Sequence, residues 1–174
     1  FLSFYRLTLV IAAIDEIWLS TDALLWVNSN SNQLLTLPLF FIEQIRIPSM
    51  TCFYTGTLPS FIQTPFLFFF APSYFSIRIG FIILAALGLL SLNYCLRHWL
   101  GKWTALFVVF LTITDTMYIR AIRRGSEHEE LLIINLLWIG LAFFTLRFNT
   151  RKSRYLAGAG LIWGIAVWSK LHMI

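Results

Sequence analysis

Long runs of apolar residues divide this chain and constrain its fold more than any other feature of the sequence. Four of them hold at most one charged residue each, at 79–96, 103–119, 131–146 and 155–169. A membrane-spanning helix needs about 17–25 such residues. The last two runs reach this length only with flanking residues, which extend the final run to 174. A fifth run resembles the end of another span within 1–14. We therefore expect an all-α, polytopic transmembrane bundle of about five spans.

The composition favours lipid over water as the surroundings of this bundle. Of the 174 residues, 59% are hydrophobic and 12% are charged, and the mean hydropathy is +0.77. A soluble domain of this size cannot bury so much apolar surface. The net charge of +5 does not indicate nucleic-acid binding, because the basic residues form short clusters between the apolar runs. We expect contact with membrane lipids and none with nucleic acid.

Two basic loops set the expected orientation in the membrane. They lie between 96 and 103 and between 146 and 155, and neither contains an acidic residue. The positive-inside rule places both on the cytoplasmic side. The eight acidic residues all fall in the other loops or in the adjoining half of a span. The segments 15–78 and 120–130 are therefore expected to be loops on the non-cytoplasmic side.

The first of these outer loops is long and has no charged residue from 47 to 77. Prolines interrupt it, at Pro48, Pro59, Pro65 and Pro72. A proline removes a backbone donor and clashes with the preceding helical turn, so we expect short helices at the membrane surface, with 66–70 entering the lipid. A further span is the alternative interpretation, and it would move Asp15 to the cytoplasmic side.

Asp15 and Glu16 are the first candidates for chemistry. They directly follow an apolar helix end on the expected outer face. Ionisable groups near the bilayer are costly to place and often functional, and a partly desolvated carboxylate can accept a proton as a general base. The alternative is a solvated pair that simply ends the span.

Topology does not explain the arginines of the second outer loop, because a basic cluster on the non-cytoplasmic side is contrary to the positive-inside rule. They are Arg120, Arg123 and Arg124. The planar fork of an arginine binds phosphate, and a lipid phosphate or pyrophosphate is the anion that a membrane face offers. Pairing with the glutamates of the same loop is the other interpretation, and the two are compatible.

Arg78 and Lys170 also approach the expected outer face, since one opens the first full span and the other lies near the end of the last. Either would add to a phosphate site or extend to the surface. No cofactor or metal site is expected. The carboxylates and imidazole of 126–130 suit a divalent metal, but a second ligand cluster and the HExxH spacing are missing.

The segment 54–61, which reads YTGTLPSF, and the residues up to Arg78 form the most specific pattern. This segment resembles the first outer loop of integral-membrane glycosyltransferases of the GT-C type, the protein-mannosyltransferase-like enzymes that use polyprenyl- or dolichyl-phosphate sugars. Further parts of the chain match that family in the same order, namely Asp15–Glu16, 97–101, 124–128 and 168–170. The resemblance thus extends over nearly the whole chain.

The resemblance implies transfer of a sugar from a lipid-phosphate donor to an acceptor hydroxyl at the non-cytoplasmic face. Asp15 matches the family's catalytic aspartate, and Glu16 is the adjacent acid of that motif. Candidate phosphate contacts are Arg78, Arg123, Arg124 and Lys170. Such enzymes have more spans than this sequence holds, so we expect an N-terminal fragment, truncated at both ends and inactive by itself.

Two other functions compete with the enzyme. A transporter segment would need polar residues aligned within its spans, yet these spans hold few besides Asp115 and the threonines near it. A non-catalytic membrane subunit would suit the small-xxx-small pair Gly160 and Gly164, although plain packing within the chain explains this pair as well. Sugar transfer that depends on Asp15 would separate the enzyme from both.

Overall fold

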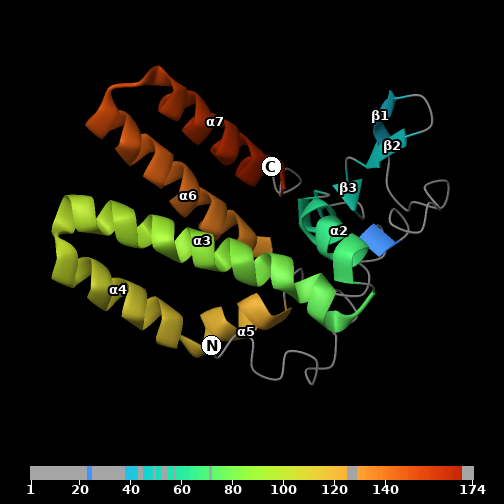
Figure 1. Cartoon of the computed structure of the whole chain (residues 1–174), viewed down its shortest axis with the longest axis horizontal. Helices are drawn as coiled ribbons and strands as arrows, with labels where there is room; N and C mark the ends of the chain where they lie inside the picture. Colours follow the sequence, from blue (N-terminus) through green and yellow to red (C-terminus); the bar gives the residue numbers. More distant parts are fainter. Residues whose placement is uncertain are drawn as a thin grey trace.

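The computed structural model describes residues 23–24, 38–42, 45–48, 50–51, 55–56, 58–70, 72–124 and 129–169. These residues form a helical bundle with short strands beside one of its ends (Figure 1). The helices are α2 (Leu58–Phe70), α3 (Tyr74–Leu100), α4 (Lys102–Thr114), α5 (Thr116–Arg124), α6 (Glu129–Thr150) and α7 (Ser153–Trp168). The predicted all-α membrane bundle is confirmed.

Two helices, α3 and α6, are long and apolar enough to cross a membrane, and α4 with α5 makes a third if that bent pair is one span. α7 has 16 residues and falls short by length. The expected five spans are therefore not confirmed within the described residues. The run expected to end a first span, within 1–14, lies outside them.

The apolar run at 103–119 is not one straight helix. It breaks at Asp115, and α4 and α5 differ in direction by 62°. The Asp115 carboxylate accepts a hydrogen bond from the backbone N–H of Met117 (3.1 Å) and so caps the start of α5. The hydroxyls of Thr112 and Thr114 donate back to carbonyls of α4, a bond that bends helices. The Asp115 side chain is exposed, so it does not face the bundle interior.

The first outer loop contains strands as well as a helix. β1 (Pro38–Ile42) pairs antiparallel with β2 (Ile45–Pro48), and β3 (Met50–Thr51) pairs with β4 (Thr55–Gly56). We did not predict these strands, although the aromatic and β-branched residues of β1 and β2 favour them. A short helix is present where one was expected: α2 has 13 residues, too few to span, and exposes the rings of Phe68, Phe69 and Phe70.

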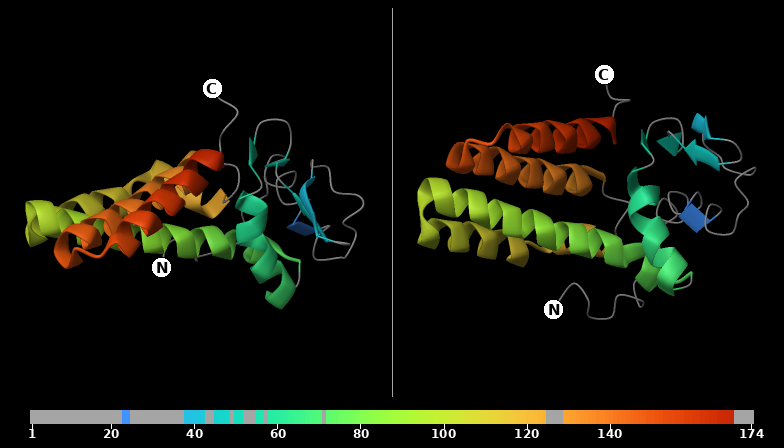
Figure 2. Two further views of the ribbon diagram at one scale, coloured as in Figure 1. Left: turned by 90° about the horizontal axis from the view of Figure 1, so that it is seen from above. Right: turned by 45° about the horizontal axis from the view of Figure 1, so that its top comes forward.

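α3 lies at the centre of the bundle, with α4 and α6 beside it and α2 against its first turns (Figures 1 and 2). α3 and α6 run parallel, since Gly88 meets Asn135 and, further along both helices, Cys95 meets Thr145. α7 then returns antiparallel along α6. Its Trp163 indole donates to the carbonyl of Leu137 (3.2 Å).

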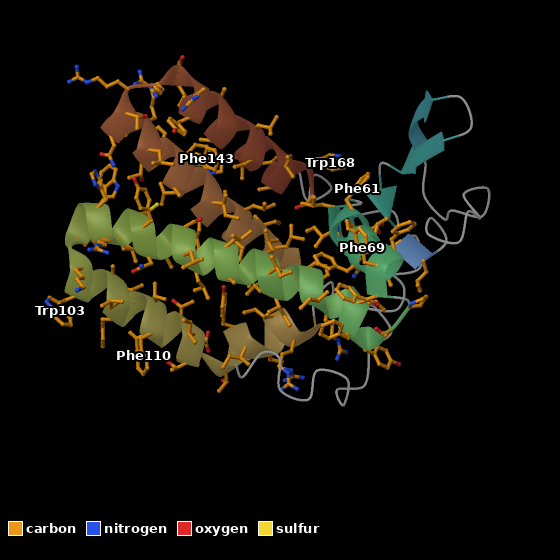
Figure 3. All side chains as sticks on the ribbon, in the orientation of Figure 1. Phe61, Phe69, Trp103, Phe110, Phe143 and Trp168 are labelled. Carbon is orange, nitrogen blue, oxygen red and sulfur yellow. The ribbon has the colours of Figure 1, made fainter. Side chains whose placement is uncertain are left out.

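The outer surface of α4 is apolar. Of its residues only Ala105 is buried, while Trp103 and Phe110 point away from the bundle and are 80% and 62% exposed (Figure 3). Large aromatic side chains exposed along a whole helix are costly in water but favourable in hydrocarbon. This surface agrees with an integral membrane protein.

Candidate functional site

The bundle has two chemically different ends. At one end the two basic loops meet, because the Trp99 indole donates to the hydroxyl of Thr145 (3.3 Å) and its ring packs edge-on against Phe148 (6.3 Å between centroids). At the other end α2 packs on the first turns of α3, and Phe61 of α2 lies beside Trp168 at the end of α7 (6.4 Å; Figure 3). Both basic loops thus lie at one end of the bundle, and the cytoplasmic side expected for them stays a prediction.

The end opposite the basic loops holds a polar corner between α2 and α3. Four polar side chains there have no exposed surface: Ser60, Gln63, Ser76 and Arg78. A buried guanidinium is rare and costly unless other groups compensate its charge. In a chain that is otherwise so apolar, this corner is the strongest candidate for a functional site among the described residues.

Local sequence explains how the corner is built. Ser73 and Ser76 form a capping box: each hydroxyl accepts from the backbone N–H of the other, at 3.1 and 2.9 Å. This box starts α3 so that Arg78 falls in its second turn, where the guanidinium lies 5.4 Å from the centre of the Tyr74 ring. The face of an aromatic ring attracts a cation. The capping box and the ring together hold Arg78 at the base of α3.

α2 approaches α3 closely because Gly80 has no side chain. A Cβ atom there would lie 2.8 Å from Cγ2 of Ile62 and 2.9 Å from its carbonyl oxygen. One turn away, Leu67 and Ile77 pack with Ala23 in a buried apolar cluster. This packing joins α2 and α3 to a segment that follows Asp15 and Glu16 along the chain.

Gln63 is the residue that our sequence reasoning missed. Its amide nitrogen and oxygen are both buried, and neither makes a hydrogen bond with a described residue. An unsatisfied buried polar group costs about 1–3 kcal/mol. The sequence feature that could have identified it is that Gln63 is the single amide side chain in the apolar sequence of α2. A group retained at that cost is a natural contact for a ligand.

The structure places some of the predicted site residues and not others. Arg78 lies in the corner, fully buried, and does not extend to the surface. Arg123 is half-buried on α5, which packs on α3 through Tyr118 and Ile122 and so lies at the same end of the bundle. Arg124 ends α5, and its side chain lies outside the described residues, as do Asp15, Glu16 and Lys170.

No group of three potential metal ligands occurs among the described residues. The stretch 126–130 lies largely outside the described part of the chain.

The fold and this corner define an integral-membrane helical protein with a buried cationic site at one end of its bundle. Residues 56–174 match the family described as dolichyl-phosphate-mannose-protein mannosyltransferase. The chain therefore belongs to this family of membrane glycosyltransferases, as the resemblance implied. No curated protein and no solved structure matches the chain. The matched segment includes Gln63, Arg78 and the other basic candidates, whereas Asp15 and Glu16 precede it.

Proposed function

We propose that the complete protein transfers a sugar from a polyprenyl- or dolichyl-phosphate donor to an acceptor hydroxyl at the non-cytoplasmic membrane face. The observation that carries this proposal is that Arg78 and Gln63 are both fully buried on two helices that pack together, within the segment that matches a glycosyltransferase family. A lipid phosphate is an anion that resides in the membrane, so its recognition calls for a cation placed below the surface of the protein.

In the proposed reaction, the acceptor oxygen forms a bond to the anomeric carbon while the bond from that carbon to the phosphate oxygen breaks. The acceptor proton passes to the carboxylate of Asp15, and the bonding electrons leave with the lipid phosphate. A general base of this kind contributes about 10²–10⁴-fold to the rate. Glu16 is assigned beside it as the second acid of the motif.

The basic residues would stabilise the negative charge that develops on the departing phosphate. Arg78 is the first candidate, because a fork of donors in a dry environment stabilises charge more strongly than one in water. Gln63 is assigned to donate its amide N–H to a phosphate oxygen. Arg123, Arg124 and Lys170 are assigned as further contacts from α5 and from the segment after α7.

The test uses native membranes that hold the intact protein and a panel of labelled polyprenyl-phosphate sugars. We expect the wild type to transfer or hydrolyse a donor and Asp15→Asn to lose at least about 100-fold in rate. Asp22→Asn is the matched control, since it removes one carboxylate from the same loop, and it should retain activity. All variants are first checked for equal abundance in the membrane.

Equal activity of Asp15→Asn and wild type would remove Asp15 from the role of base. Absence of transfer with every donor would oppose the enzymatic assignment and favour the non-catalytic subunit.

A further inference from the structure

A second site lies at the basic end of the bundle, far along α6 from the polar corner. It is a pocket of about 520 Å³ between the last turns of α6 and the start of α7. Its lining residues are Phe144, Arg147, Phe148, Arg151 and Leu156. Two cations thus stand beside an apolar wall, a combination suited to an amphiphilic anion.

The surroundings of the pocket are strongly positive. Residues 74–114 and 131–169 contain no Asp or Glu, so no carboxylate of α3, α4 or α7 opposes these arginines. Arg154 of the same loop contacts Tyr155 through a hydrogen bond (3.4 Å) and ring stacking. By contrast, the side chains of Arg147 and Arg151 form no hydrogen bond or ion pair with any residue that the structure describes. As far as the described residues go, their donors remain available to a ligand.

The backbone at Arg151 is unusual. Its φ of 57° is in the left-handed region, and its N–H donates to the carbonyl of Arg147 (2.8 Å) to end α6. Glycine is the usual residue at such a helix end, because a side chain is strained there. An arginine held at this position, next to a second arginine, is the kind of local strain that marks functional sites.

Aromatic side chains indicate the depth of the pocket in the bilayer. Trp99 and Trp103 are 59% and 80% exposed at this end, and tryptophans of this kind gather at the level of the lipid headgroups. The pocket wall contacts the first of these two indoles, because Phe148 packs edge-on against Trp99. We therefore expect Arg147 and Arg151, at the same end of the bundle, to lie at headgroup level.

We propose that this pocket binds one anionic phospholipid of the surrounding leaflet. Arg147 and Arg151 hold its phosphate, and an acyl chain follows the wall made by Phe144, Phe148 and Leu156. Basic pockets between spanning helices bind such headgroups by the same chemistry. This site is separate from the sugar-donor corner and does not depend on the proposed enzymatic activity.

Native mass spectrometry of the intact protein in detergent, titrated with phosphatidylglycerol and with phosphatidylcholine, tests the proposal. We expect one phosphatidylglycerol to be retained in preference to phosphatidylcholine. The double variant Arg147→Gln/Arg151→Gln should bind it at least about tenfold more weakly. Lys152→Gln/Arg154→Gln is the matched control: it removes the same charge from the same loop outside the pocket and should bind nearly as well as wild type.

A further variant separates the contribution of the apolar wall to binding from the contribution of charge. Leu156→Trp fills the pocket without changing its charge, and it should also lose the retained lipid. Equal losses in the two double variants would show general electrostatic attraction and overturn the site, as would undiminished binding after Arg147→Gln/Arg151→Gln. Displacement of the lipid by glycerophosphate at equal concentration would show that the wall contributes nothing and would overturn the assignment to a lipid.

Discussion

The close contact between α3 and α6 at Gly88 predicts the cost of adding a single methyl group there. A Cβ atom on Gly88 of α3 would lie 2.2 Å from Oδ1 of Asn135, 2.8 Å from its Cγ and 2.9 Å from its Cβ. Asn135 has 1% exposure and accepts a hydrogen bond from the Tyr118 hydroxyl (3.0 Å). Gly88→Ala must therefore displace a buried amide that already bonds a third helix.

Rotation of the Asn135 side chain about its Cα–Cβ bond relieves the two shorter contacts but not the third, because Cβ is fixed to the backbone of α6. Carbon atoms pack at about 3.5 Å, so α3 and α6 must separate by about 0.6 Å. Overpacking of this kind costs about 1–3 kcal/mol, and an interhelical hydrogen bond in a membrane contributes about 0.6 kcal/mol. Alanine regains about 1 kcal/mol of helix propensity. The expected net loss of stability is about 0.6–2.6 kcal/mol.

Gly160→Ala is the control, since no atom lies within 4 Å of a Cβ atom there. It should gain the same helix propensity without the steric cost. The difference in unfolding free energy between the two variants then gives the cost of overpacking and of the lost hydrogen bond, about 1.6–3.6 kcal/mol. The measurement is unfolding of the purified intact protein by SDS in mixed micelles, followed by circular dichroism.

Asn135→Ala adds a second test of the same contact. It removes the two atoms that lie nearest to the new methyl group, so Gly88→Ala/Asn135→Ala should be less destabilised than the sum of the single variants. If Gly88→Ala unfolds at the same SDS concentration as Gly160→Ala, the close packing of α3 on α6 is refuted.

Three further changes have distinct signatures. Gly140→Ala places a methyl group 2.2 Å from Nε1 of Trp163, so it should loosen α6 from α7 by about 1–3 kcal/mol and alter the fluorescence of that tryptophan. Asp115→Ala removes the cap of α5 and should cost about 0.5–2 kcal/mol in SDS unfolding, while Asp115→Asn, which keeps an accepting oxygen, should cost little. Gln63→Leu removes an unsatisfied buried amide, so it should raise stability by about 1–3 kcal/mol while reducing sugar transfer; unchanged transfer in membranes would argue against a ligand contact.

The membrane bundle was predictable from the sequence because long uncharged apolar runs form spanning helices. The runs 79–96 and 131–146 lie within α3 and α6, and the two basic clusters lie at the same end of the bundle. The break at Asp115 was not predicted, because hydropathy averages over a run and does not register that a single carboxylate can cap a helix within it. A threonine–aspartate–threonine sequence carries that information locally.

The candidate site was predictable only in part. Arg78 was singled out by its place in a motif, but extension to the surface was also an open interpretation, and its burial depends on how α2 packs on α3. That contact needs Gly80 opposite Ile62, two residues far apart in sequence with no pattern to join them. Gln63 was missed for the same reason: an isolated amide becomes informative only when its surroundings prove to be apolar.

The connections at the basic end are very short: Gly101 alone joins α3 to α4, and Arg151 and Lys152 join α6 to α7. Each pair of helices is therefore a hairpin whose turn is too short to let the two helices move apart. With 16 residues, α7 is too short to span a bilayer stably by itself. During synthesis it emerges directly after α6. We expect the two to leave the insertion machinery as a unit, with Trp163 already hydrogen-bonded to α6, so that this hairpin is the smallest part of the chain that acquires its topology.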